Sequence, residues 1–219
     1  MPPALTAQEI RRVARTTIAT LAGQGLESCL FGSAACAIYG MTHRVPNDVD
    51  LVVLEDSLDP EEIKDMIVSA NNNFYLVPAA NPRNTYNVLW YYLPRNRRCK
   101  VDILTPGLLS IPDIPPENVV RVDQFQDIPV TPLLPLLLLK LRGWTDHMED
   151  PRRWMQEKAS VDEEDIDELL ELAVDDYDVH LDDESDWLPN WFIEEARERV
   201  DEYVQAWPDS EDYWSQLGF

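Results

Sequence analysis

Two aspartates two residues apart, Asp48 and Asp50, stand at the start of an apolar segment that continues to Leu54. In an extended strand such residues point to the same side, with Cα atoms about 6.5–7 Å apart. From that spacing, both carboxylates can reach a pair of divalent cations about 3.5–4 Å apart. The pattern therefore predicts a metal site, although Asp-x-Asp before a strand is also common as a purely structural turn.

A Gly-Ser pair precedes the aspartates. Gly32 and Ser33 separate a short apolar run that ends at Phe31 from the helix-favouring residues 34–39. This order predicts a strand, a tight turn and a helix that ends at Gly40. Glycine lets the backbone N–H groups of the turn approach a ligand, and the positive end of the helix dipole favours an anion. Gly32 and Ser33 are therefore candidate ligands of a phosphate group.

A third carboxylate, Asp102, lies in a short strand expected over residues 100–104, where apolar residues flank it. Lys100 shares the strand face with Asp102. It also belongs to the densest basic cluster of the sequence, which comprises Arg95, Arg97, Arg98 and Lys100. Such residues at a hairpin tip keep a sheet edge soluble or, alternatively, attract a nucleoside triphosphate.

Taken in order, these motifs resemble those of the DNA polymerase β-like nucleotidyltransferases. That family has a Gly-Gly or Gly-Ser turn, an acid-hydrophobic-acid-hydrophobic strand, and one more acid on a later strand. Arg44 lies shortly before the aspartate pair. An arginine in this place also resembles the pattern of the minimal, aminoglycoside-adenylyltransferase and AbiEii-like toxin branches of the family. The resemblance covers the first half of the chain strongly and the second half loosely. It implies an α/β (α+β) fold: a small mixed sheet with flanking helices, followed by a helical C-terminal region.

The resemblance also implies a reaction, the Mg²⁺-dependent transfer of a nucleoside monophosphate from a triphosphate such as ATP to a hydroxyl, with release of pyrophosphate. The catalytic residues, which would also hold Mg²⁺ or Mn²⁺, are Asp48, Asp50 and Asp102. The nucleotide-binding residues are Gly32, Ser33, Arg44, Lys100 and Lys140. Lys140 stands alone among leucines, so it either extends to solvent or, as in AbiEii-like relatives, faces the cleft and binds triphosphate.

Capping and periodicity predict the elements that position these residues. Thr6 and Glu9 have capping-box spacing before an amphipathic helix over residues 7–22, and Asp59 begins a second helix that reaches about Ala70. The other expected segments are strands at 74–77, 87–93 and 100–104, a Pro-rich crossing at 105–129 with a strand at 119–122, and helices at 132–144, 163–173 and 190–207. We expect two domains, 1–128 and 129–219.

The charge of the chain bears on its partners. The 219 residues include 41 Asp and Glu against 18 Lys and Arg, for a net charge of −23, and most of the excess acid follows residue 150. Long nucleic acid is disfavoured, because phosphate binding requires clustered Lys and Arg. A cationic acceptor, either an amine-rich small molecule or a protein, fits this charge better. Solvated acidic helices are the alternative explanation.

Cysteine content and hydropathy predict the compartment. Cys29, Cys36 and Cys99 are odd in number and lack zinc-ligand spacing, which favours a reducing, intracellular environment, and we expect the cytoplasm. The apolar run at 130–141 is interrupted by two prolines and a lysine and is shorter than a spanning helix. We expect a protein without a secretory signal and without membrane association.

An alternative hypothesis keeps the fold without the chemistry, as an antitoxin-like binding or regulatory protein that uses its acidic tail to engage a basic partner. The three carboxylates favour the enzyme, because a protein without catalysis need not keep such a cluster. Nucleophilic hydrolysis is disfavoured, since Ser33 has no nearby base and the three histidines show no triad pairing.

Overall fold

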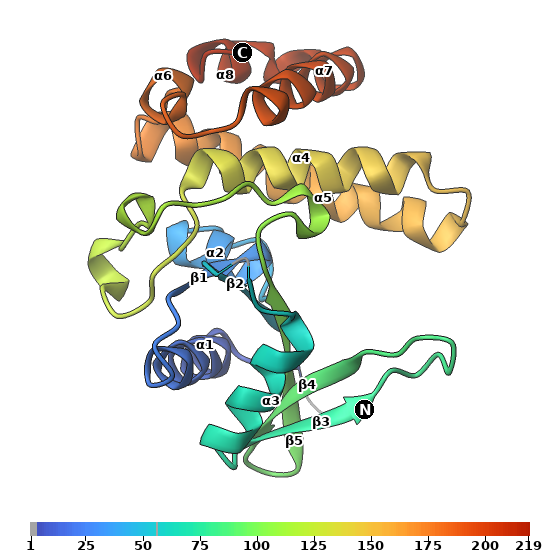
Figure 1. Ribbon diagram of the computed structural model, residues 1–219. Helices are drawn as coiled ribbons and strands as arrows, with labels where there is room; N and C mark the ends of the chain where they lie inside the picture. Colours follow the sequence, from blue (N-terminus) through green and yellow to red (C-terminus); the bar gives the residue numbers. More distant parts are fainter. Residues whose placement is uncertain (1–3, 56) are drawn as a thin grey trace.

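A computed structural model describes residues 4–55 and 57–219. A five-stranded mixed sheet occupies the N-terminal half, and the C-terminal half is helical (Figure 1). The strands are β1 (Ser28–Phe31), β2 (Asp48–Val53), β3 (Phe74–Pro78), β4 (Asn87–Leu93) and β5 (Arg97–Leu104). The α-helices are α1 (Ala7–Ala22), α2 (Gly32–Tyr39), α3 (Pro60–Ala70), α4 (Leu133–Glu149), α5 (Arg153–Glu171), α6 (Leu181–Glu184), α7 (Asn190–Ala206) and α8 (Glu211–Gln216).

The sheet order is β1-β2-β5-β4-β3. Within this sheet β2 and β5 pair in parallel, whereas β1 and β2, β4 and β5, and β3 and β4 pair antiparallel. The hairpin of β4 and β5 therefore inserts its second strand beside β2, next to the strand that carries the aspartate pair. This arrangement confirms the predicted mixed sheet with flanking helices.

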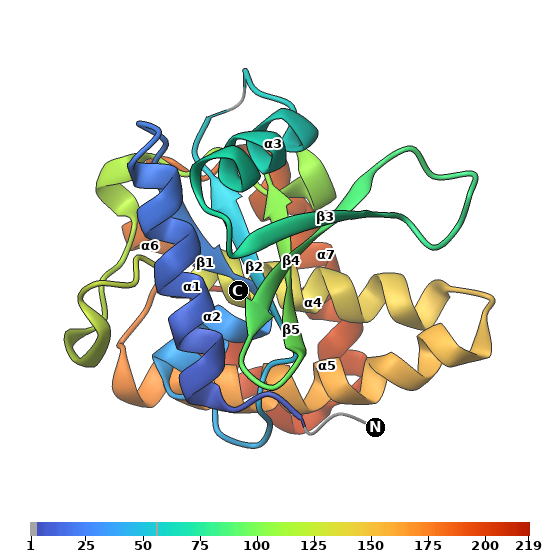
Figure 2. The same ribbon diagram turned by 90° about the horizontal axis from the view of Figure 1, so that it is seen from below.

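Local signals fix the helices that cover one face of this sheet. Thr6 and Glu9 form the predicted capping box of α1, and Asp59 and Glu62 form another at the start of α3. Both helices lie across the same side of the sheet (Figure 2). The alternating apolar residues of β4 and β5 point toward them and are buried.

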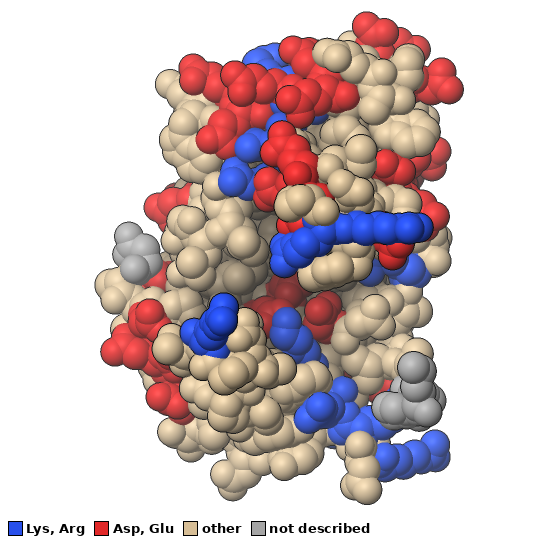
Figure 3. All heavy atoms as spheres, turned by 90° about the vertical axis from the view of Figure 1, so that its right-hand side faces the viewer, with Lys and Arg blue, Asp and Glu red and all other residues tan. Residues whose placement is uncertain are grey.

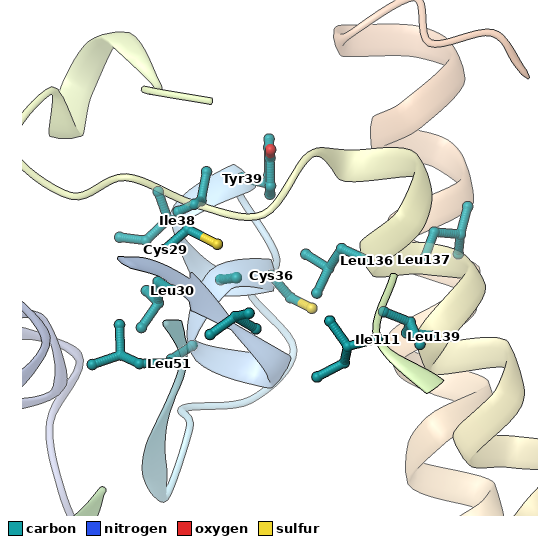
Figure 4. Packing of buried hydrophobic residues seen from close by; sticks show 14 of the residues in the cluster. Cys29, Leu30, Cys36, Ile38, Tyr39, Leu51, Ile111, Leu136, Leu137 and Leu139 are labelled. Atoms are coloured by element: carbon teal, nitrogen blue, oxygen red, sulfur yellow. The ribbon is translucent and has the colours of Figure 1, made fainter. Parts of the chain in front are cut away.

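On the opposite face of the sheet, α2 packs on β1 and β2 and also contacts α4. Here the leucines of α4 complete an apolar core with β1 and α2 (Figure 4). The labelled side chains are Cys29, Leu30, Cys36, Ile38, Tyr39, Leu51, Ile111, Leu136, Leu137 and Leu139. The boundary predicted between residues 128 and 129 thus lies beside a shared core, and the division into two domains stays a prediction.

The structure differs from the sequence-based expectation in the second half. The helix expected at 163–173 begins ten residues earlier, at Arg153, and the strand expected at 119–122 is reduced to a single bridge from Val120 to Val130. The first half of α5 carries few buried residues, so it has no apolar stripe for periodicity to detect. The short helices α6 and α8 were not predicted.

Two further expectations concern the environment of the chain. Within residues 4–55 and 57–219, no helix is long and apolar enough to cross a membrane. Cys29, Cys36 and Cys99 are free and buried, and burial raises the pKa of each thiol to about 12. The three thiols therefore stay protonated at neutral pH and serve as small apolar side chains.

Candidate active site

Parallel pairing of β2 and β5 brings the three predicted carboxylates together. Asp50 lies opposite Asp102 in the ladder, and Asp48 lies opposite Lys100. Asp48, Asp50 and Asp102 each offer an oxygen atom, and these atoms lie within 4.8 Å of one another. The geometry is that of a candidate metal centre, while the role of the three residues as ligands stays a prediction.

The electrostatics of the cluster call for a cation. Burial raises the pKa of Asp50 to about 8, and the charges of Asp48 and Asp102 act in the same direction. Burial likewise raises the pKa of Asp48, although Lys100 partly offsets the effect. Oxygen donors crowded in this way suit Mg²⁺ or Mn²⁺, which would remove the repulsion between them. The residues present therefore fit a divalent metal ion.

Gly32 lies directly beside this cluster. Its φ of +61° is in the left-handed region, and a Cβ atom at this position would overlap with Oδ2 of Asp50. Only glycine allows the carboxylate to lie so close to the turn. Gly32 also begins α2, and Ser33 is buried in its first turn, where backbone N–H groups have no partner within the helix. The turn predicted to bind phosphate and the candidate metal centre are thus adjacent.

Lys100, predicted to bind nucleotide, forms an ion pair with Asp102 on the same strand face. Burial opposes the charge of Lys100, but the hydrogen bond to Asp102 and the negative charges of Asp102, Asp48 and Asp50 together outweigh burial and raise the lysine pKa. Both side chains are about one third exposed, 38% for Lys100 and 33% for Asp102. A ligand that enters from solvent can therefore reach this pair.

The other two predicted cations, Arg44 and Lys140, meet at one buried carboxylate. The Arg44 guanidinium donates two hydrogen bonds to Asp165, of 2.6 and 2.5 Å, and Lys140 Nζ lies 2.5 Å from the same residue. Lys140 does not extend to solvent, because its side chain is only 14% exposed. Its positive charge acts against the rise in pKa that burial causes at Asp48 and Asp50.

Sequence reasoning missed the acidic face of α5 that holds these cations. Asp165 is fully buried, and although burial opposes its charge, Arg44 and Lys140 lower its pKa. Three residues away on either side, Asp162 pairs with His147, and Glu168 pairs with His43. Acids spaced three apart beside an apolar stripe were the available signal, because such spacing places them on one helix face.

The β3–β4 and α4–α5 connections project on the same side of the molecule (Figures 1 and 2). Viewed from that side, the surface is hollowed between the sheet and the helical region (Figure 3). Asp and Glu side chains lie at the floor of the hollow, and Lys and Arg side chains lie at its margin.

Comparison with known proteins shows which solved structures share this fold. No protein-family model matches the sequence, and no curated protein matches it. The chain is similar to an antigenic nucleotidyltransferase-like protein from Paracoccidioides brasiliensis, with 16% identity, a TM-score of 0.69, and coverage of 98% of this chain and 95% of that one. It is also similar to JHP933 from Helicobacter pylori, with 18% identity, a TM-score of 0.53, and coverage of 96% and 79%. The predicted nucleotidyltransferase fold is confirmed.

Proposed function

We propose that this protein is a Mg²⁺-dependent nucleotidyltransferase that moves a nucleoside monophosphate from a triphosphate such as ATP to a hydroxyl and releases pyrophosphate. The observation that carries the proposal is the convergence of Asp48, Asp50 and Asp102 beside the turn at Gly32 and Ser33. The fold supports the same class of reaction, since it is shared with a nucleotidyltransferase-like protein.

The carboxylates would hold the metal ions. Asp48 and Asp50 project from one strand face, and Asp102 completes the set from the neighbouring strand. When bound, divalent ions would neutralise phosphate oxygens and lower the pKa of the attacking hydroxyl. The raised pKa of Asp50 fits this role, because a group that is costly to ionise alone is stabilised by a cation.

The triphosphate would lie toward α2. Backbone N–H groups of the first helical turn, at Gly32 and Ser33, would donate to the outer phosphates. Arg44 and Lys140 would add positive charge, held in place by their shared contact with Asp165. Lys100 would complete the set from the other side of the carboxylates.

Transfer itself is a displacement at phosphorus. The acceptor oxygen forms a bond to the α-phosphorus, the bond from that phosphorus to the bridging oxygen breaks, and pyrophosphate leaves. The hydroxyl proton passes to Asp102, whose carboxylate lies beside Lys100 in an ion pair.

The test is incubation of the pure protein with each of the four α-labelled triphosphates and Mg²⁺ or Mn²⁺, with Asp48→Asn as the control. Label transferred by the wild type and not by the variant supports the proposal. Absence of both transfer and triphosphate binding contradicts it. Binding without turnover, together with recovery of a stoichiometric basic partner, would instead favour the regulatory alternative.

A further inference from the structure

The carboxylate-bearing face of the sheet continues past the metal centre onto β4 and β3. Trp90 of β4 lies opposite Lys100 in the ladder, and Tyr75 of β3 lies opposite Trp90. Tyr92, two residues after Trp90 on β4, lies opposite Arg98 of β5. Paired residues point to the same side, so all of them share the face of Asp48 and Asp102. We call Tyr75, Trp90, Tyr92 and Arg98 the aromatic-basic face.

This face has a definite chemistry. The Arg98 guanidinium lies 4.0 Å from the centroid of the Trp90 ring, and the rings of Tyr75 and Tyr92 stack 4.1 Å apart. Tyr92 is 56% exposed. Within residues 4–55 and 57–219, Arg98 forms no ion pair. The face therefore presents planar π surfaces and a cation with no neutralising carboxylate.

A cavity of about 320 Å³ adjoins the face. Trp90 and Arg98 form one wall, and Asn47, the neighbour of Asp48, forms another. Ala4 and Leu5 line the side toward α1. Space for a ligand group thus lies between the aromatic-basic face and the start of the carboxylate strand.

The position of the face relative to Asp102 indicates what it would bind. The following step rests on the proposed function. The triphosphate lies toward Gly32, at the β1 and β2 side of the centre, and Asp102 lies on the opposite side, on β5. Neighbouring strands are about 4.8 Å apart, and Trp90 of β4 lies opposite Lys100, two residues along β5 from Asp102. A molecule whose hydroxyl is at Asp102 can therefore extend diagonally over Trp90. The acceptor body would therefore rest on the aromatic-basic face.

We propose that the aromatic-basic face is the acceptor subsite and that the acceptor combines a planar aromatic ring with an anionic group, the chemistry of a nucleotide. Its ring stacks on Trp90 or on the Arg98 guanidinium, and its anionic group pairs with Arg98. A polycationic acceptor would instead meet an unneutralised guanidinium. The net charge of −23, which favours a cationic acceptor, does not describe this face, because most of the acidic excess follows residue 150.

The test offers labelled triphosphate and Mg²⁺ with three acceptors in parallel: nucleoside 5′-monophosphates, a short oligoribonucleotide with a free 3′-hydroxyl, and an amine-rich aminosugar. The proposal predicts transfer to the first or the second, which separates a free nucleotide from a chain end, and none to the third. Transfer to the aminosugar, or to neither nucleotide acceptor, would overturn it.

Variants test the residues themselves. Trp90→Ala should raise the KM for the acceptor roughly tenfold or more, because ring stacking is lost, and leave the KM for triphosphate unchanged. Arg98→Gln should act in the same direction and backs up the first variant if that one folds poorly. Trp191→Ala is the matched control, since Trp191 is 45% exposed on α7, outside this face. An acceptor KM as little affected by Trp90→Ala and Arg98→Gln as by the control contradicts the assignment.

Binding of metal and triphosphate is measured separately by thermal shift. If the wild type is stabilised by Mg²⁺ and triphosphate but the acceptor results go against the prediction, the acceptor subsite alone is wrong. If the wild type shows no such stabilisation, the proposed function fails as well.

Discussion

The carboxylate of Asp50 lies against the backbone of Gly32, so close that a Cβ atom on residue 32 would overlap with Oδ2 of Asp50. One contact thereby joins the turn proposed to bind phosphate to the strand proposed to bind metal. Neither residue can be moved without the other, and the proposed site depends on both.

Gly32→Ala should therefore lower both stability and ligand binding. Its φ of +61° costs alanine about 1 kcal/mol, and the displaced Asp50 adds to that cost. Gly25→Ala is the matched control, because Gly25 has a φ of +80° but no neighbour within 4 Å of the added Cβ. In thermal denaturation both variants should lose stability, but only Gly32→Ala should lose the stabilisation by Mg²⁺ and ATP. Equal ligand stabilisation in the two variants would disprove the coupling.

Asp50→Asn should stabilise the metal-free protein above neutral pH. The folded-state pKa of Asp50, about 8, exceeds the usual unfolded value of about 3.9, so folding favours the protonated acid. The stability that comes from this protonated carboxyl group is fully present below the unfolded pKa. It is lost progressively as the pH rises from there through the folded pKa of about 8. In chelator, the variant should gain on the wild type from pH 4 to pH 8, by up to about 5 kcal/mol in unfolding free energy.

Denaturant unfolding of both proteins across this pH range measures that difference. Added Mg²⁺ and ATP should reverse the ranking, because they stabilise the wild type by mass action and the variant far less. A wild type that is more stable than Asp50→Asn in chelator at pH 8 would mean that structural hydrogen bonds satisfy Asp50.

Asp165 should act on triphosphate binding through Arg44 and Lys140. Asp165→Asn removes the carboxylate that both cations share, so we expect weaker ATP binding and a lower melting temperature. Lys140→Met keeps most of the side-chain volume but removes one charge. A double-mutant cycle on ATP affinity should give a coupling energy of about 1–3 kcal/mol between the two sites. Strictly additive effects would show that Asp165 and Lys140 act independently.

The features of the fold and of the site differ in whether the sequence alone could predict them. The capped helices α1 and α3 were predicted well because capping residues and apolar spacing are local signals. The carboxylate cluster was predicted because period-two alternation puts Asp48 and Asp50 on one face and Asp102 is the single acid of a short apolar strand. The family resemblance then joined the three acids in one site. The parallel register that places Asp102 opposite Asp50 required the structure.

The partners of Arg44 and Lys140 were beyond local patterns. Asp165 lies 121 residues after Arg44 and 25 after Lys140, so only tertiary packing brings them together. The same holds for the aromatic-basic face, where Trp90 and Arg98 meet through strand register. The acceptor predicted from net charge and the acceptor inferred from this face differ, because charge acts locally once the chain is folded. The parallel acceptor assay decides between them.

The most direct test of the metal centre is a titration of Mn²⁺ followed by electron paramagnetic resonance, in the presence of a non-hydrolysable triphosphate. Three carboxylate oxygens within 4.8 Å should bind the ion in the wild type. Asp50→Asn removes one charged ligand and should weaken the affinity roughly tenfold or more. Equal Mn²⁺ affinity in the wild type and in Asp50→Asn would contradict the proposed metal centre and the nucleotidyl transfer that depends on it.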